Sequence, residues 1–132
     1  MGESNDTINA ANTETNLTPS TPSNPNLTDP SVLRSLGDQF KQEGELEAAI
    51  RYYEQSIAIK PDDHEVHILL AAAREVVGRS DEAINSYQKA VALKPDYAEA
   101  HGKLGRAFQK VGKMDEARAS YQKAIETNPL LN

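Results

Sequence analysis

The sequence has no cysteine and no tryptophan among its 132 residues, and aromatic residues make up only 5% of it. Without cysteine, the chain has no disulfide framework, no thiolate metal site and no cysteine nucleophile. Lysine and arginine number 14 against 20 aspartate and glutamate residues, which gives a net charge of −6. A nucleic-acid binder needs a basic surface to displace phosphate counterions, so this charge argues against nucleic acid as a partner.

Long hydrophobic runs are also lacking. No run of about 18 consecutive apolar residues is present, so the sequence predicts neither a membrane-spanning helix nor a membrane partner. The first residues carry neither the basic nor the apolar segment of a secretory signal. The length suits one modest domain. We therefore expect a soluble, cytoplasmic protein in a reducing compartment.

Motifs for catalysis are absent as well. The sequence contains no glycine-rich phosphate loop, no nucleophile elbow and no kinase signature. His64 and His67 flank a glutamate, Glu65, as in zinc proteases, but that motif needs one more residue between the histidines to place both on one helical face. No third ligand accompanies them. We expect no enzymatic activity, no catalytic residues, no metal and no cofactor.

The residues that are present divide near residue 30. Residues 1–29 contain no lysine, arginine or aromatic residue and consist mostly of asparagine, threonine, serine and proline. Such a segment cannot bury enough apolar area to offset a backbone ordering cost of about 1–2 kcal/mol per residue. We predict a disordered tail over residues 1–29 and a folded domain over residues 30–132.

A period of 34 residues organises this domain. Five positions hold the same residue type in three successive copies, and they predict repeat units at 30–63, 64–97 and 98–131. The identical positions are Leu36, Leu70 and Leu104; Gly44, Gly78 and Gly112; Ala49, Ala83 and Ala117; Tyr53, Tyr87 and Tyr121; and Pro61, Pro95 and Pro129.

Each unit has the pattern of two helices. In the third unit, apolar residues recur at helical spacing on both sides of Gly112, where glycine eases a left-handed turn. Pro129 marks the end of the second helix because proline lacks the N–H that would continue it. We interpret the alanine, tyrosine and leucine positions as core packing between stacked helical pairs.

These positions resemble the tetratricopeptide repeat signature. The third unit shows it in His101, Leu104-Gly105, Phe108, Ala117, Tyr121 and Pro129. The second unit departs from it at Ala71 and Arg74. The resemblance implies an all-α fold, a right-handed superhelical stack of three helix-turn-helix hairpins. It also implies a non-enzymatic scaffold whose concave groove, lined by the first helix of each repeat, holds a peptide or partner segment.

Ten residues are the candidates for this groove. Four of them share one face of the second unit's first helix and are apolar, with basic residues in the flanking units. We predict a protein or peptide ligand with an apolar centre and acidic ends. The alternative is that the apolar residues only broaden the core. The candidates are Arg34, Asp38, Lys41, Ile68, Leu69, Ala72, Val76, Lys103, Arg106 and Lys110, with Glu65, Glu75 and Glu99 beside them.

Some members of this family hold the acidic tails of heat-shock proteins in a clamp of five lysine, arginine and asparagine residues. The matching positions here hold Arg34, Asp38, Leu69, Glu99 and Lys103. Only Arg34 and Lys103 keep the positive charge, and leucine cannot donate a hydrogen bond. We expect no tight binding of such tails.

The final helix suggests a different function. Repeat stacks need a polar outer face on their last element, yet Tyr121, Ala124, Ile125, Leu130 and Leu131 are apolar candidates for exposure there. The alternative function is a structural or oligomerisation element that self-associates through this helix, or the N-terminal part of a longer array.

Overall fold

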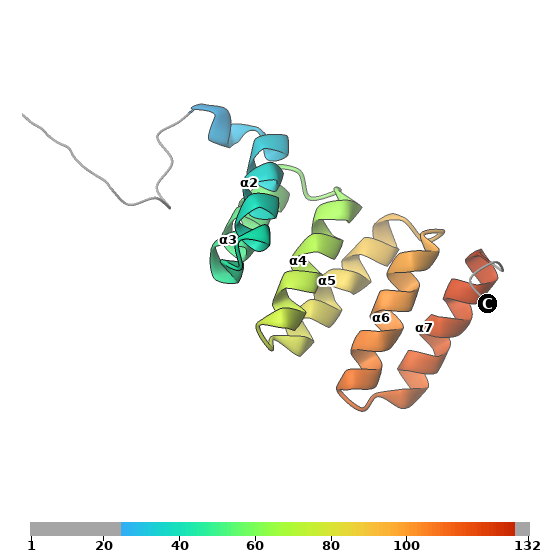
Figure 1. The fold of residues 1–132 in the computed structure, drawn as a ribbon. Helices are drawn as coiled ribbons and strands as arrows, with labels where there is room; N and C mark the ends of the chain where they lie inside the picture. Colours follow the sequence, from blue (N-terminus) through green and yellow to red (C-terminus); the bar gives the residue numbers. More distant parts are fainter. Residues whose placement is uncertain (1–24, 129–132) are drawn as a thin grey trace, which may run out of the picture.

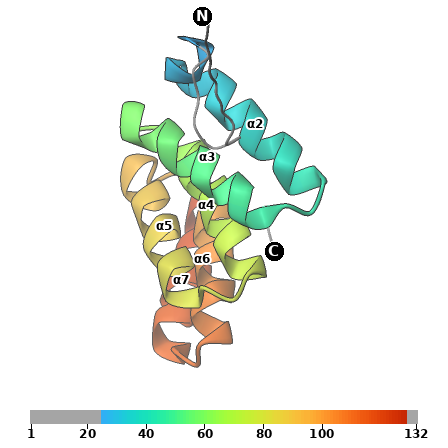
Figure 2. The same cartoon turned by 90° about the vertical axis from the view of Figure 1, so that its left-hand side faces the viewer.

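The computed structural model describes residues 25–128, and this part of the chain is helical with no strand. The helices pair in order into three hairpins that stack side by side (Figure 1). Figure 2 shows the hairpins following one another from α2 at one end to α7 at the other. The predicted all-α superhelical stack of three hairpins is confirmed. The elements are η2 (Pro25–Thr28), α2 (Pro30–Gln42), α3 (Leu46–Ile59), α4 (His64–Val76), α5 (Ser80–Leu93), α6 (Ala98–Lys110) and α7 (Met114–Thr127).

The helical structure begins a few residues before the predicted boundary at residue 30. Most of the predicted disordered tail, residues 1–24, lies outside the described residues. Its last residues form η2 and the cap of α2, where the Asp29 carboxylate accepts a hydrogen bond from the Ser31 N–H at 2.9 Å. Ser56 of α3 donates to the Pro30 carbonyl at 2.9 Å. Composition alone did not reveal these local caps.

Glycine ends the first helix of each hairpin. Gly44, Gly78 and Gly112 have φ values of 83°, 88° and 84°, which side-chain-bearing residues rarely adopt. The next residue's N–H then reaches back to a carbonyl of the helix's last turn, which satisfies an acceptor that the helix itself leaves free. These bonds are Glu45 to Phe40 at 2.8 Å, Arg79 to Arg74 at 2.8 Å and Lys113 to Phe108 at 2.9 Å.

Two apolar clusters hold the hairpins together, and the alanine and tyrosine positions lie in both. One cluster joins the first hairpin to the second, and the other joins the second to the third. The predicted core role of these positions is therefore confirmed. The first cluster contains Ala49, Ile50, Tyr53, Val66, Leu70 and Ala73. The second contains Ala71, Ala83, Ile84, Tyr87, Leu104, Ala107, Phe108 and Ala117.

The two ends of the described stack are less buried than its middle. Leu36 is only half-buried, whereas Leu70 and Leu104 are buried, because no described hairpin precedes α2. At the other end Ile125 is 41% exposed, as predicted. The prediction was wrong for Ala124, which is buried. Leu130 and Leu131 lie outside the described residues.

Close packing of the two helices in a hairpin depends on one small residue opposite each tyrosine. A Cβ atom on Gly37 would lie 2.6 Å from the ring of Tyr53, and one on Gly105 would lie 2.9 Å from the ring of Tyr121. Real Cβ atoms do not approach other atoms so closely, so the tyrosine would have to move. In the first and third hairpins the glycine therefore sets how near the first helix lies to the second, whereas the middle hairpin holds Ala71 at this position.

We expect Gly37→Ala to lower the free energy of unfolding by about 1–3 kcal/mol, the usual cost of overpacking a core. Gly102→Ala is the matched control, because this α6 glycine has no atom within 4 Å of the added Cβ. That variant should gain about 0.5–1 kcal/mol from helix propensity. Urea denaturation measures both changes, and equal stability of the two variants would contradict the packing argument.

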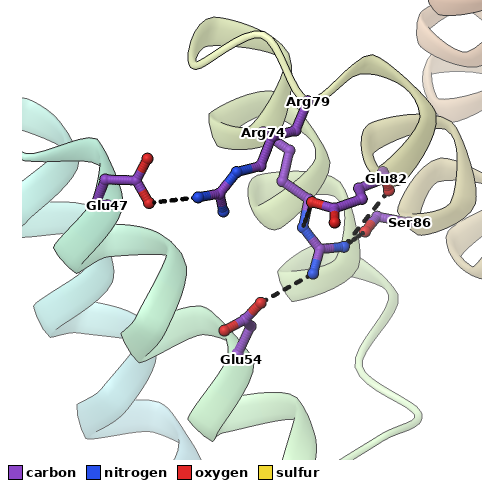
Figure 3. Close-up of polar contacts among 6 residues, drawn as sticks. All are labelled: Glu47, Glu54, Arg74, Arg79, Glu82 and Ser86. Carbon is purple, nitrogen blue, oxygen red and sulfur yellow. Dashed lines mark hydrogen bonds and ion pairs between the residues drawn. The ribbon is translucent and has the colours of Figure 1, made fainter.

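A partly buried arginine links the first two hairpins at a position where the other hairpins carry phenylalanine. Arg74 replaces the residue type found at Phe40 and Phe108. Its guanidinium donates to Glu54 of α3 at 2.9 Å and to the Ser86 hydroxyl of α5 at 2.6 Å (Figure 3). The middle hairpin is thus tied to the preceding one by charge as well as by apolar contact.

We expect Arg74→Ala to lower the free energy of unfolding by about 1–3 kcal/mol, because it leaves the buried Ser86 hydroxyl without its donor and removes the ion pair with Glu54. Arg79→Ala is the control: Arg79 also binds an α3 carboxylate at 2.9 Å, that of Glu47, but is more exposed (Figure 3). Its loss should cost less than about 1 kcal/mol. Thermal melting followed by circular dichroism compares them. An equal loss in both variants would show that burial of Arg74 adds nothing.

Candidate functional site

The first helices of the hairpins share one face. Arg34 of α2 forms an ion pair with Glu65 of α4 at 2.7 Å. Lys110 of α6 lies 3.6 Å from Glu75, which is also on α4. Side chains of neighbouring first helices therefore meet across the hairpin boundaries. We call this surface the α2–α4–α6 face, and all ten residues predicted for the groove belong to its three helices.

A hollow of about 210 Å³ lies on this face at the centre of the stack. Ile68 and Leu69 form its apolar part, and both are half-buried. Ile68 also packs against the second apolar cluster and Leu69 against the first. The two interpretations drawn from the sequence, groove and broadened core, therefore apply to the same side chains. The remaining lining residues are Arg34, Glu65, Tyr97 and Glu99.

Charge at the rim of this hollow is paired. The hydrogen bond and charge of Arg34 hold the pKa of Glu65 below its usual value, and Glu65 in turn raises the pKa of Arg34. Lys103 lies 3.7 Å from Glu99, one turn away on α6. The hollow therefore presents an apolar floor between two compensated ion pairs.

Tyr97 is a residue of the hollow that no sequence pattern predicts. It immediately precedes α6, its hydroxyl donates to Glu99 at 3.2 Å, and its ring meets His64 edge-on at 5.5 Å between centroids. Burial, aided by Glu99, raises the pKa of its hydroxyl. No periodic signal marks this position, because the preceding unit has Asp63 there.

A second polar cluster surrounds Glu75. Its side chain is only 8% exposed and accepts a hydrogen bond from the Tyr87 hydroxyl at 2.8 Å. Arg106 lies 3.9 Å from one carboxylate oxygen and Lys110 lies 3.6 Å from the other. Burial, with the bond to Glu75, raises the pKa of Tyr87. The predicted groove residues Arg106 and Lys110 thus share one internal carboxylate.

The other tyrosines of the repeat behave similarly. Tyr53 donates to Asp38, another predicted groove residue, and burial raises the pKa of Tyr53. Tyr121 donates to Gln109 at 2.9 Å. A tyrosine from each second helix therefore places its hydroxyl on a side chain of the first helix. The repeat pattern predicts packing alone for these tyrosines, so their hydrogen bonds are an addition from the structure.

The remaining predicted residues stand apart from both clusters. Ala72 and Lys41 are half-buried on α4 and α2, and no ion pair of Lys41 is found within residues 25–128. Val76 ends α4 and is 69% exposed. Val76 therefore offers apolar surface that the stack itself does not use.

The histidines of the zinc-like pattern have different surroundings. The Nε2 atom of buried His67 lies 2.8 Å from the Pro61 carbonyl, and His101 makes the same contact with Pro95. His64 instead contacts Tyr97. Among the described residues, no group of three potential metal ligands is found. Within the same range, no helix combines the length and apolar character needed to cross a bilayer.

Comparison with protein-family models gives matches over most of the chain. A model described as TPR repeat matches residues 37–75 and 77–112, and a model described as tetratricopeptide repeat matches residues 98–129. Together they overlap each of the three predicted units, from residue 37 to residue 129. A search of curated proteins finds no match.

Solved structures with the same fold include a crystal structure of MamA, with a TM-score of 0.74 and 27% identity over 77% of this chain. This chain spans 60% of that MamA chain. The first TPR of Spaghetti (RPAP3), bound to the HSP90 peptide SRMEEVD, has a TM-score of 0.72 and 25% identity. That match covers 76% of this chain and 79% of the RPAP3 chain.

Proposed function

Because the chain belongs to the tetratricopeptide repeat family, we propose that it is a non-enzymatic scaffold that binds an extended peptide or partner segment on its α2–α4–α6 face. The fold is that of a protein-interaction module. The first TPR of RPAP3, whose structure is similar, is bound to a peptide. The cytoplasm remains the predicted location.

The hollow at Ile68 and Leu69 is the observation that carries this proposal. Apolar side chains on a rigid element, rimmed by a few polar groups, suit an apolar anchor residue of a ligand. The rim is ordered by the Arg34–Glu65 ion pair and by the hydrogen bond from Tyr97. Val76, exposed on the same helix, extends the apolar surface along the face.

The acidic ends expected for the ligand remain a prediction. The charges of the face limit the affinity that such acidic ends would add. Four of the five predicted basic residues lie 3.9 Å or less from a carboxylate oxygen of this chain, so only part of their charge remains for a ligand. The apolar contacts therefore carry most of the proposed affinity. These four residues are Arg34, Lys103, Arg106 and Lys110.

We expect Leu69→Asp and Val76→Asp each to weaken binding of peptides selected from a random library by about tenfold or more, since a buried unpaired charge opposes docking. Leu93→Asp is the matched control, because Leu93 lies on α5 and is also exposed. Fluorescence anisotropy measures the affinities, and circular dichroism verifies folding. Folded Val76→Asp with undiminished affinity, or an equal loss in Leu93→Asp, would remove the face from the binding site.

Self-association through α7 is the second candidate, and the apolar surface of that helix favours it. Met114 is 53% exposed and Ile125 is 41% exposed. A hollow of about 310 Å³ lies beside Met114 and Tyr121. This surface is not purely apolar, because Arg118 lines the hollow at the repeat position that isoleucine occupies in Ile50 and Ile84.

Sedimentation equilibrium tests this second candidate. If α7 mediates association, the protein forms dimers whose dissociation constant rises with Ile125→Asp, because the charge opposes burial of the helix face. Ala119→Asp, at another exposed position of α7, serves as the control. A strictly monomeric protein at the highest attainable concentration would eliminate this function.

A further inference from the structure

Glu75 is the most buried of the acidic residues that pair with cations on the α2–α4–α6 face. Its side chain is 8% exposed, whereas those of Glu65 and Glu99 are more than half exposed. The equivalent positions in the other hairpins hold Lys41 and Gln109. A buried carboxylate at this position is therefore a property of the middle hairpin, and it lies beside the last turn of α6.

The surroundings of Glu75 fix its carboxylate in one place. The hydroxyl of Tyr87, a fully buried residue, donates to Oε1 at 2.8 Å. The second oxygen, Oε2, is buried and accepts no hydrogen bond from the described residues, although Lys110 lies 3.6 Å away. Arg106 lies 3.9 Å from Oε1. The carboxylate of Glu75 therefore lies between two cations, Arg106 and Lys110.

The two cations remain accessible from solvent. More than half of the side-chain surface of Arg106 and of Lys110 is exposed. Their distances to Glu75 are those of ion pairs and not of hydrogen bonds, so their N–H donors are still available. Without an internal anion, two exposed cations at the end of one helix would attract an acidic ligand. Glu75 cancels part of that attraction before any ligand arrives.

We propose that Glu75 determines which ligand charge the face accepts. This proposal rests on the proposed function. The Glu75 carboxylate takes the place that a ligand carboxylate would occupy at Arg106 and Lys110. In contrast to the acidic ends predicted from the sequence, the α2–α4–α6 face therefore selects peptide segments that are neutral or of mixed charge and discriminates against acidic ones. Arg106 and Lys110 form an anion site that is filled from within the chain.

Glu75→Gln tests this proposal, because glutamine keeps the shape and can still accept the Tyr87 hydrogen bond. The probes are the acidic heptapeptide SRMEEVD and its amide counterpart SRMQQVN. Glu126→Gln is the matched control, since it removes the same charge from an exposed position on α7. Fluorescence anisotropy at low salt gives the affinity of each protein for each peptide.

We expect the natural protein and Glu126→Gln to bind SRMEEVD weakly, and Glu75→Gln to bind it about tenfold more tightly, since two exposed ion pairs typically contribute on this scale. The gain should be absent for SRMQQVN, should fall with added salt and should disappear when Arg106→Gln and Lys110→Gln are added. Equal affinity of Glu75→Gln and the natural protein for SRMEEVD, or an equal gain for SRMQQVN, would overturn the proposal.

This outcome is separable from that of the proposed function. The loss of affinity for library-selected peptides in Val76→Asp tests whether the face binds ligands at all. The gain for an acidic peptide in Glu75→Gln tests only which charge the face accepts. Circular dichroism shows whether Glu75→Gln is folded like the natural protein. Only a folded variant that shows no gain in affinity for SRMEEVD counts against the proposal. If Glu75→Gln is unfolded, Lys110→Gln in the natural protein decides: the proposal requires that it change SRMEEVD binding by less than twofold, and a larger loss overturns it.

Discussion

The tyrosine repeated in each hairpin connects the core of the stack to its candidate binding face. The rings of Tyr53 and Tyr87 are completely buried between helices, and their hydroxyls emerge at the first helix. A buried hydroxyl must find a partner, so each first helix has to supply an acceptor. Packing in the core therefore dictates part of the chemistry of the face.

This constraint explains how charge is distributed over the α2–α4–α6 face. Asp38 and Glu75 serve as acceptors for tyrosine hydroxyls, and an ionised acceptor brings a negative charge with it. In the third hairpin the acceptor is the neutral Gln109, and the cations Arg106 and Lys110 of the same helix lie within 3.9 Å of Glu75. The face is consequently almost compensated, and its apolar hollow becomes the feature most able to discriminate among ligands.

The sequence was sufficient to predict the elements of the fold, because each repeated residue acts locally. Glycine at positive φ ends a first helix, and the alanine and tyrosine positions fill the space between helices. The sequence was insufficient to predict features that depend on contacts between units. The ion pair of Arg34 with Glu65, the place of Tyr97 in the hollow and the burial of Ala124 all depend on how neighbouring helices pack. No spacing within one unit encodes those contacts.

Amide NMR of the natural protein with a library-selected peptide tests the central claim most directly, because it locates the contact without any substitution. We predict that the shifted amides lie in α2, α4 and α6 and are centred on Ile68, Leu69 and Tyr97. Shifts confined to α7, or to the outward-facing residues of α3 and α5, would contradict it.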